Sequence, residues 1–216
     1  MKAFIFDMDG VIFDSERLYI DCCIEVAEKL GMDQIVETCH RCIGVTTEVT
    51  RAILLETYRD IDLVDRFREQ SVALVRSKID SGLLEIKPGV RELLDFLCAK
   101  GCRIAIASST RTDIVEKELA DAGLIGYFSA VVGGDRAQRS KPNPDIFLKA
   151  AELLGEKPEN CVVIEDSFNG IRAAKAAGMT ALMVPDQLVP DEEIRGLADF
   201  VLPSLLVVKE QIKSWN

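Results

Sequence analysis

Short apolar runs alternate with amphipathic stretches along most of this chain of 216 residues. The first run, AFIF at 3–6, is too short for a core helix and is rich in aromatic and β-branched residues, which predicts a strand buried on both faces. Similar runs predict further strands at 103–107, 130–132, 161–164, 180–184 and near 200–202. Helical stretches, most of which end at a glycine, lie at 90–100, 113–122, 143–155 and 169–177, with another at the end of the chain. Strands that alternate with helices in this way specify a parallel sheet with right-handed crossovers.

Residues 15–82 interrupt this rhythm, because no strand signal occurs among them. Helices are predicted from Ser15 to about Leu30, from Thr46 or Thr47 to Tyr58, and from Val64 to about Ile79. A polar connection that contains Cys39 and Gly44 is expected after the first of these helices. The residues expected on the inward faces are Leu18, Cys22, Val26 and Leu30, and then Phe67, Val72 and Val75.

The two patterns together predict an α/β fold with a Rossmann-like parallel-sheet core and an inserted, all-helical cap domain. The predicted core comprises residues 1–14 and 84–216, and the predicted cap comprises residues 15–83. Asn143 followed by Pro144 is expected to open one of the core helices, with Asn143 as its N-cap.

Composition and charge narrow the class of protein. The formal net charge of −10 argues against a role on nucleic acids or on a membrane surface, because both require basic patches. No apolar stretch approaches the length of about 18 residues that a membrane span needs, and the N-terminus lacks a signal-type segment. We therefore expect a cytoplasmic protein, monomeric, with neither nucleic-acid nor membrane partners.

The seven cysteines are expected to be reduced thiols, since the chain has no secretory signal. The stretch from Cys39 to Cys42 (CHRC) holds a C-x-x-C pair and the single histidine. A structural zinc site usually needs a second ligand pair at matching spacing, and none is visible nearby. Helix packing is the favoured interpretation of these cysteines.

Two acidic residues follow the first predicted strand. Asp7 ends it, and alternation along an extended segment points Asp9 the same way as Asp7. Gly10 then allows the backbone to turn sharply or to pass close to a ligand. Carboxylates beyond the carboxyl end of a buried strand lie where open α/β sheets bind ligands, although an acidic turn without a ligand is the simpler alternative.

Further polar groups are expected to converge on these carboxylates. Ser108 follows the strand at 103–107, Glu165 and Asp166 follow the strand at 161–164, and Lys141 comes from a loop. Carboxylates suit Mg²⁺, and a lysine and a serine hydroxyl suit phosphate oxygens. Each has a structural alternative: a helix cap for Ser108, an N-cap for Asp166, and a solvated charge for the lysine. Together they favour phosphoryl transfer.

Other phosphate chemistries lack their motifs. The chain has no G-x-x-x-x-G-K-[ST], no G-x-G-x-x-G and no G-x-S-x-G, and no cysteine is followed by an arginine six positions later. A carboxylate remains as the nucleophile. Its repulsion by phosphate, roughly 4 kcal/mol per pair of unit charges at 4 Å, would be offset by a divalent cation and Lys141.

Four stretches in order carry a resemblance to a known family: DMDGVIFD, ASST, RSKPNPD and VVIEDSFNGIRAAKAAGM. They resemble the motifs of the haloacid dehalogenase superfamily, in its phosphatase and phosphoglucomutase-like branch with a helical cap after the first motif. The resemblance implies Asp7 as nucleophile, Asp9 as general acid and then base, and Ser108 and Lys141 as phosphate ligands. It also implies Mg²⁺ held by Asp7, the Asp9 carbonyl and Asp166, with Glu165 assisting.

The chain departs from the β-phosphoglucomutases of that branch at two cap positions. Those enzymes carry a histidine at the position that matches Tyr19 and an arginine at the position that matches Thr47. Both departures favour hydrolysis of small phosphorylated metabolites, sugar phosphates above all, over a mutase reaction. Glu16 matches a glutamate of many sugar-phosphate phosphatases. An equal alternative is that Glu16 only stabilises the first turn of its helix, where acidic side chains are favoured. The substrate-binding candidates are Gly10, Glu16, Gly44, Ser109, Thr110, Arg111 and Asn143.

A non-catalytic phospho-receiver module is the alternative from another class. Receivers also place an aspartate, Mg²⁺, a serine or threonine and a lysine on a parallel sheet. In receivers, however, the acidic pair precedes the phosphorylated aspartate in the sequence. Here Glu165 and Asp166 come long after Asp7. The enzyme is therefore the favoured hypothesis.

Overall fold

The computed structural model describes residues 3–43 and 47–215. The chain divides into two compact units, one made of residues 1–13 and 86–216 and the other of residues 14–85. The roles predicted for them, catalytic core and substrate cap, stay predictions. No helix among the described residues is long and apolar enough to cross a membrane.

The first unit is built on a six-stranded sheet in which every neighbouring pair is parallel. Its strands are β1 (Ala3–Phe6), β2 (Ile104–Ala107), β3 (Ala130–Val132), β4 (Cys161–Glu165), β5 (Thr180–Met183) and β6 (Phe200–Val201). The strand order is β3-β2-β1-β4-β5-β6, so the direction of winding reverses beside β1. Open sheets bind ligands at such a switch point, outside the carboxyl ends of the strands. The predicted α/β class with a parallel sheet is confirmed.

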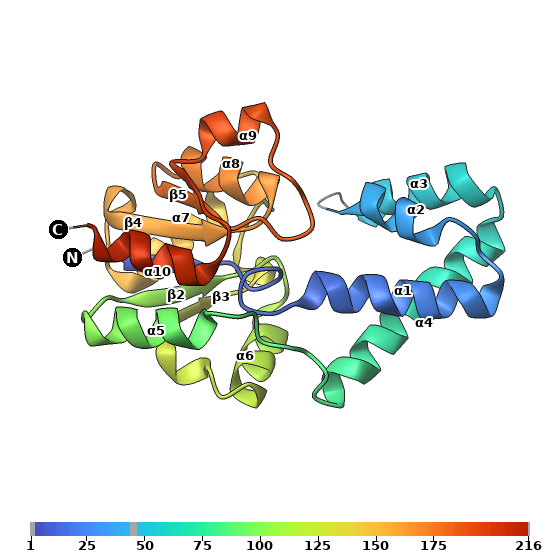
Figure 1. Ribbon diagram of the computed structural model, residues 1–216, viewed down its shortest axis with the longest axis horizontal. Coiled ribbons are helices and arrows are strands. Elements are labelled where there is room, and N and C mark those ends of the chain that lie inside the picture. Colours follow the sequence, from blue (N-terminus) through green and yellow to red (C-terminus); the bar gives the residue numbers. More distant parts are fainter. Residues whose placement is uncertain (1–2, 44–46, 216) are drawn as a thin grey trace. The chain divides into compact units, whose positions relative to one another are not determined.

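Helices cover both faces of this sheet (Figure 1). The helices of this unit are α5 (Val90–Ala99), α6 (Thr112–Asp121), α7 (Asp145–Leu154), α8 (Phe168–Ala176), α9 (Glu192–Leu197) and α10 (Leu205–Lys213). On one face, alternate strand residues such as Ile5 and Val163 form a buried cluster with helices α7 and α8. Helices α5 and α10 pack against one another. Short 3₁₀ turns lie at η1 (Ile125–Tyr127), η2 (Gly134–Arg136) and η3 (Pro158–Asn160).

Three details of this unit differ from the sequence-based expectation. The N-cap of α7 is Pro144, while the Asn143 side chain donates instead to the Ser140 carbonyl at 3.0 Å, so the predicted Asn143 cap is wrong. The N-cap of α8 is Ser167, not Asp166. Helix α9 was not among the predicted helices, and it buries only Ile194.

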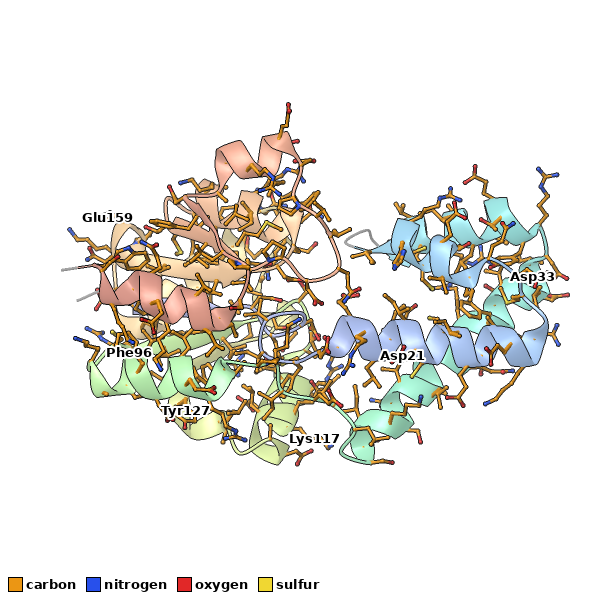
Figure 2. All side chains as sticks on the ribbon, viewed as in Figure 1. Asp21, Asp33, Phe96, Lys117, Tyr127 and Glu159 are labelled. Carbon is orange, nitrogen blue, oxygen red and sulfur yellow. The ribbon has the colours of Figure 1, made fainter. Side chains whose placement is uncertain are left out.

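The second unit contains no strand among its described residues, as predicted. Its helices are α1 (Ser15–Leu30), α2 (Ile35–Cys42), α3 (Thr47–Tyr58) and α4 (Ile61–Asp80). Their inner faces share one apolar cluster, to which α1 contributes Cys23 and Val26 and α4 contributes Phe67. The Tyr58 hydroxyl donates to the Asp33 carbonyl at 2.8 Å, which ties the end of α3 to the loop before α2; Figure 2 labels Asp33 in that loop.

Two expectations for the helical unit are wrong. Cys39 belongs to helix α2 and not to a polar connection. Val72 is 61% exposed, and its neighbour Ser71 is buried instead, because Ser71 lies on the same face of α4 as the buried Val64 and Phe67. On α1, Cys23 and Ala27 are buried more deeply than the predicted Leu18 and Leu30. Gly31 ends α1 in the left-handed conformation, as its position predicted.

Candidate active site

Asp7 and Asp9 lie directly beyond β1, at the switch point of the sheet. The amide of Asp7 donates to the Ile164 carbonyl at 2.9 Å, which extends the pairing of β1 with β4 by one residue. The chain then turns tightly, because the Met8 carbonyl accepts from the amides of Ile12 and Phe13 at 2.8 and 3.1 Å. This turn fixes Asp9 against the loop after β2.

That loop supplies two hydroxyl groups to Asp9. Thr110 Oγ1 donates to Asp9 Oδ2 at 3.1 Å, and the buried Ser108 Oγ lies 3.4 Å from the same oxygen. The amide of Thr110 donates to Ser108 Oγ at 3.0 Å. The structure therefore brings together Asp9, Ser108 and Thr110, which the sequence had singled out separately.

Lys141 reaches the same edge of the sheet from the loop before α7. Its ammonium donates to Asp7 Oδ1 at 2.5 Å, to Glu165 Oε1 at 2.6 Å and to the Ala107 carbonyl at 3.3 Å. An ammonium has three N–H groups, so these acceptors use all of its donors. The ring of Phe147 lies 4.9 Å from Nζ and covers a further side of the cation.

Burial and charge compete at this ion pair. Burial raises the pKa of Asp7, and the positive charge of Lys141 opposes that rise. Burial by itself lowers the pKa of Lys141, but the negative charges of Asp7 and Glu165 outweigh it and leave the lysine pKa above its ordinary value. Lys141 therefore stays an ammonium, and its charge favours the ionised, nucleophilic form of Asp7.

Glu165, the last residue of β4, is fully buried, and both of its carboxylate oxygens accept hydrogen bonds. Its Oε1 accepts from Lys141, while Oε2 accepts from the amides of Asp166 and Ser167 and from Ser167 Oγ, each at 2.9 Å. A Cβ on Gly170 would lie 1.8 Å from this carboxylate, so only glycine fits there. These contacts make Glu165 a fixed support for Lys141 and for the start of α8.

An oxygen cluster suited to a metal ion lies beside this pair. One carboxylate oxygen each from Asp7, Glu165 and Asp166 lie within 4.8 Å of one another, and no other such group occurs in the part of the chain that the structure describes. The turn presses against it: Gly10 has φ +73°, and a Cβ there would meet Asp166 Oδ2 at 2.3 Å. All the donors are hard oxygens, so the set fits Mg²⁺.

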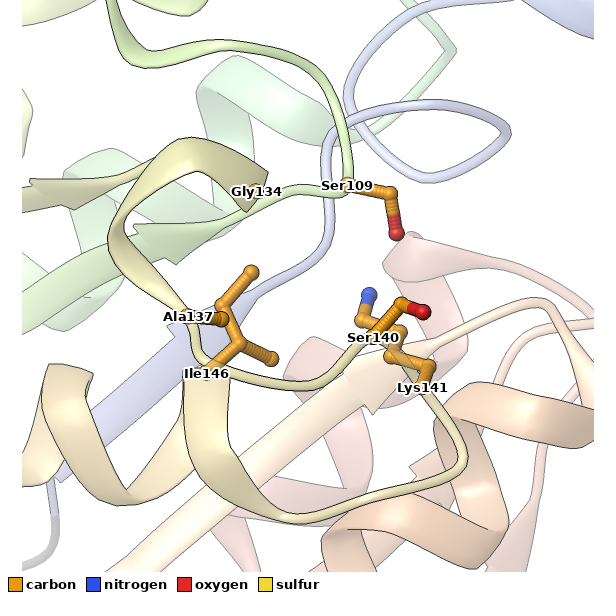
Figure 3. Close-up of a pocket in the computed structure, with 6 residues that line it drawn as sticks. All are labelled: Ser109, Gly134, Ala137, Ser140, Lys141 and Ile146. Atoms are coloured by element: carbon orange, nitrogen blue, oxygen red, sulfur yellow. The ribbon is translucent and has the colours of Figure 1, made fainter.

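Other predicted residues lie around this cluster. Ser109 and Lys141 line a pocket of about 100 Å³, into which Ser140 also projects (Figure 3). The Arg111 guanidinium is paired with Asp113 at 3.0 Å on the first turn of α6. Glu16 lies on the first turn of α1 in the helical unit, and Gly44 lies outside the described residues, so substrate binding by these two stays a prediction.

Comparison with known proteins identifies the family. The model of the haloacid dehalogenase-like hydrolases matches residues 4–184. The chain belongs to this family. It is 38% identical over 179 residues to a phosphorylated carbohydrates phosphatase of Thermotoga maritima, covering 83% of this chain and 82% of that one. It is 36% identical over 183 residues to the fructose-1-phosphate phosphatase YqaB of Escherichia coli, covering 83% and 94%.

A solved structure from Thermotoga maritima, provisionally described as a β-phosphoglucomutase, is similar over its whole length. It has a TM-score of 0.83 and 32% sequence identity, and the match covers 100% of each chain. This haloacid dehalogenase-like hydrolase therefore resembles both phosphatases and a mutase-type structure. The predicted family resemblance is confirmed.

One set of supporting residues in this hydrolase was not predicted. Asp135, in η2, accepts from the Thr112 amide and hydroxyl at 2.7 and 2.8 Å, and Gly134 N donates to the Thr110 carbonyl at 2.9 Å. A Cβ on Gly134 would lie 2.3 Å from the Ser109 carbonyl. The turn after β3 thus supports the loop that carries Ser108. The only signal was Gly133-Gly134-Asp135 after a strand, which the sequence alone could not pair with Thr112.

Proposed function

We propose that this protein is a Mg²⁺-dependent phosphatase that hydrolyses small phosphorylated metabolites, sugar phosphates above all, through an aspartyl-phosphate on Asp7. One observation carries the proposal: the buried Asp7 carboxylate contacts the Lys141 ammonium at 2.5 Å and lies in the same oxygen cluster as Asp166. A nucleophilic carboxylate needs nearby positive charge to approach a phosphate dianion.

In the first half-reaction, a carboxylate oxygen of Asp7 forms a bond to phosphorus while the bond to the leaving oxygen breaks. Asp9 donates a proton to that oxygen, so that an alcohol departs. The contacts from Thr110 and Ser108 hold the Asp9 carboxyl in one orientation. In the second half-reaction Asp9 takes a proton from water, the water oxygen bonds to phosphorus, and Asp7 is released with inorganic phosphate.

The oxygen cluster supports the metal part of the proposal. Asp7 and Asp166, with Glu165 behind them, would hold Mg²⁺, and the bound ion would neutralise charge on the phosphate oxygens. The Lys141 ammonium adds a second positive charge, which contacts Asp7 Oδ1 and Glu165 Oε1. Gly10 has no side chain and so leaves room for the Asp166 carboxylate, which is consistent with metal binding by Asp166.

The relatives favour a phosphorylated carbohydrate as substrate. Two proteins at least 36% identical are a phosphorylated carbohydrates phosphatase and a fructose-1-phosphate phosphatase. A sugar phosphate is also compatible with a net charge of −10, because it needs only a small site and no basic surface. The phosphate would lie between Ser108, Lys141 and the amides of the loop after β2.

A mutase is the second candidate, favoured by the similarity to the structure provisionally described as a β-phosphoglucomutase. A mutase must hold a bisphosphate intermediate, which demands extra cationic or proton-relay groups. Tyr19 packs against the apolar cluster of the helical unit. Tyr19 and Thr47 cannot supply the positive charge that a histidine and an arginine supply at the matching positions of the mutases, so hydrolysis is favoured.

Phosphate release from a panel of sugar phosphates, with Mg²⁺ and with a chelator, tests the proposal. We expect turnover with Mg²⁺, none with chelator, and inhibition by Ca²⁺, whose longer bonds and looser geometry misplace Asp7. A parallel coupled assay for glucose 6-phosphate, primed with the bisphosphate, separates the two candidates. Full activity in chelator contradicts the metal site, and conversion of β-glucose 1-phosphate faster than phosphate release supports the mutase.

A further inference from the structure

A second buried ion pair lies in the α/β unit, outside the residues assigned to the proposed reaction. The Lys87 ammonium contacts Asp186 Oδ1 at 2.5 Å, and the two side chains are only 18% and 8% exposed. Lys87 belongs to the segment by which the chain returns from the helical unit, and Asp186 lies in the loop that follows β5. The pair therefore joins two segments that are 99 residues apart in the sequence.

Stability alone is a poor explanation of this pair. Asp186 Oδ2 is buried and has no hydrogen-bonding partner among the described residues. Burial of an ion pair costs free energy unless hydrogen bonds satisfy the remaining oxygens and protons, and two apolar side chains of similar volume often serve stability equally well. The geometry that the pair imposes on the two segments is therefore the better explanation.

The Asp186 end of the pair is held by the sheet. The Val184 amide donates to the Glu165 carbonyl at 2.7 Å, which extends the pairing of β5 with β4 by one residue. Pro185 then has its φ angle fixed by its ring. Asp186 therefore follows a rigid strand end, at the same carboxyl edge of the parallel sheet at which Asp7 follows β1.

The Lys87 end of the pair is bonded to the turn that carries Asp9. The Lys87 amide donates to the Ile12 carbonyl at 2.9 Å. The amides of Ile12 and Phe13 donate in turn to the Met8 carbonyl, at 2.8 and 3.1 Å. Because Asp9 lies inside this hydrogen-bonded turn, a shift of Lys87 would move the Ile12 carbonyl and, with it, the backbone of Asp9.

We propose that Lys87 and Asp186 are positioning residues for Asp9. The ion pair fixes the return segment against the loop after β5, and the Lys87 amide passes that constraint to the turn that contains Asp9. This role rests on the proposed function, in which Asp9 protonates the leaving oxygen. A general acid must lie within hydrogen-bonding reach of the atom that it protonates, so a small displacement of Asp9 weakens this step.

The dependence of the rate on the leaving group separates this role from a general loss of stability. The value of kcat/KM covers the steps up to departure of the alcohol, where the Asp9 proton is needed. A sugar phosphate releases an alkoxide that requires this proton, whereas p-nitrophenyl phosphate releases a stable phenolate that does not. Misplacement of Asp9 should therefore lower kcat/KM about 10- to 100-fold for fructose 1-phosphate and at most about threefold for p-nitrophenyl phosphate.

Three variants of the whole protein make the comparison. Lys87→Met breaks the pair, and the double variant Lys87→Met/Asp186→Leu removes both charges, so that no uncompensated carboxylate is left in the interior. Lys175→Met is the matched control, because Lys175 contacts Asp199 at 2.8 Å and links α8 to the residue before β6. We expect the selective loss on fructose 1-phosphate in both Lys87 variants, a melting temperature of the double variant close to that of the wild type, and no selective loss in Lys175→Met.

Amide hydrogen exchange provides a readout that needs no substrate. In both Lys87 variants the Ile12 and Phe13 amides should exchange at least about tenfold faster, while the amides that pair β1 with β4 keep their wild-type rates. Unchanged exchange, equal losses on the two esters, or recovery of the fructose 1-phosphate rate in the double variant would each overturn the proposal. An inactive wild type whose variants still exchange faster would reject the proposed function and not the coupling of the ion pair to the turn.

Discussion

The two units of this hydrolase hold their polar groups in different ways. In the α/β unit three candidate site residues are fixed by contacts with other elements: Lys141 reaches β1 and β4, Glu165 supports the start of α8, and Asp9 is held by the loop after β2. In the helical unit the surface cations pair mainly with exposed acids, such as Arg51 with Asp65. We propose that reaction chemistry resides in the first unit and substrate selection in the second.

The strongest test of this division is removal of the proposed nucleophile. Asp7→Asn should lower turnover at least about 1,000-fold, because an amide is a far weaker nucleophile and a poorer metal ligand. The fold should persist, since an amide of the same shape still accepts from Lys141. Phosphate release and circular dichroism measure the two quantities. Substantial phosphatase activity in Asp7→Asn would end the covalent mechanism, whatever the substrate.

Lys141→Met should damage both activity and stability. The buried carboxylates of Asp7 and Glu165 would then face one another without a cation, at a cost of about 3–5 kcal/mol in the free energy of unfolding. Turnover should fall about 100-fold or more because Asp7 loses the charge that favours its ionised form. Denaturant unfolding and phosphate release give both numbers.

Lys149→Met is the matched control for that variant. Lys149 is more than one-third exposed and pairs with Glu152 on the surface of α7. An exposed pair contributes at most about 1 kcal/mol, and this one lies outside the proposed site. Equal losses in the two variants would show that Lys141 has no special electrostatic role.

Gly10→Ala tests the contact between the turn and Asp166. The new Cβ would meet Asp166 Oδ2 at 2.3 Å, which should displace that carboxylate and raise the Mg²⁺ concentration needed for half-maximal activity about tenfold. Gly178→Ala separates this clash from backbone strain, because Gly178 has the same φ of +73° and no atom within 4 Å of its Cβ position. Magnesium titrations of both variants make the measurement. A similar shift in Gly178→Ala would assign the effect to strain alone.

These residues also show what the sequence could and could not predict. Buried runs such as AFIF and CVVI gave the strands and therefore the edge where Asp7 and Glu165 meet, because parallel strands align their carboxyl ends. The support of Thr112 by Asp135 depends on two elements that meet only in the fold. Helix α2 was missed because its first turn begins after Gln34 in the left-handed conformation, without a side-chain cap. Helix α9 was missed because it buries only one residue.

The smallest effect is expected at Glu16, the one candidate of the helical unit that the structure describes. If this unit selects the substrate, Glu16→Gln should raise KM a few-fold for sugar phosphates that offer a hydroxyl to the carboxylate, with kcat little changed, because a hydrogen bond made equally in ground and transition states affects binding alone. A phosphomonoester without such a hydroxyl should keep its KM. Glu28→Gln, on the last turns of the same helix, is the control. If KM rises equally for both substrates, Glu16 acts on the helix N-terminus and not on the sugar, and the selective role of the helical unit must rest on other residues.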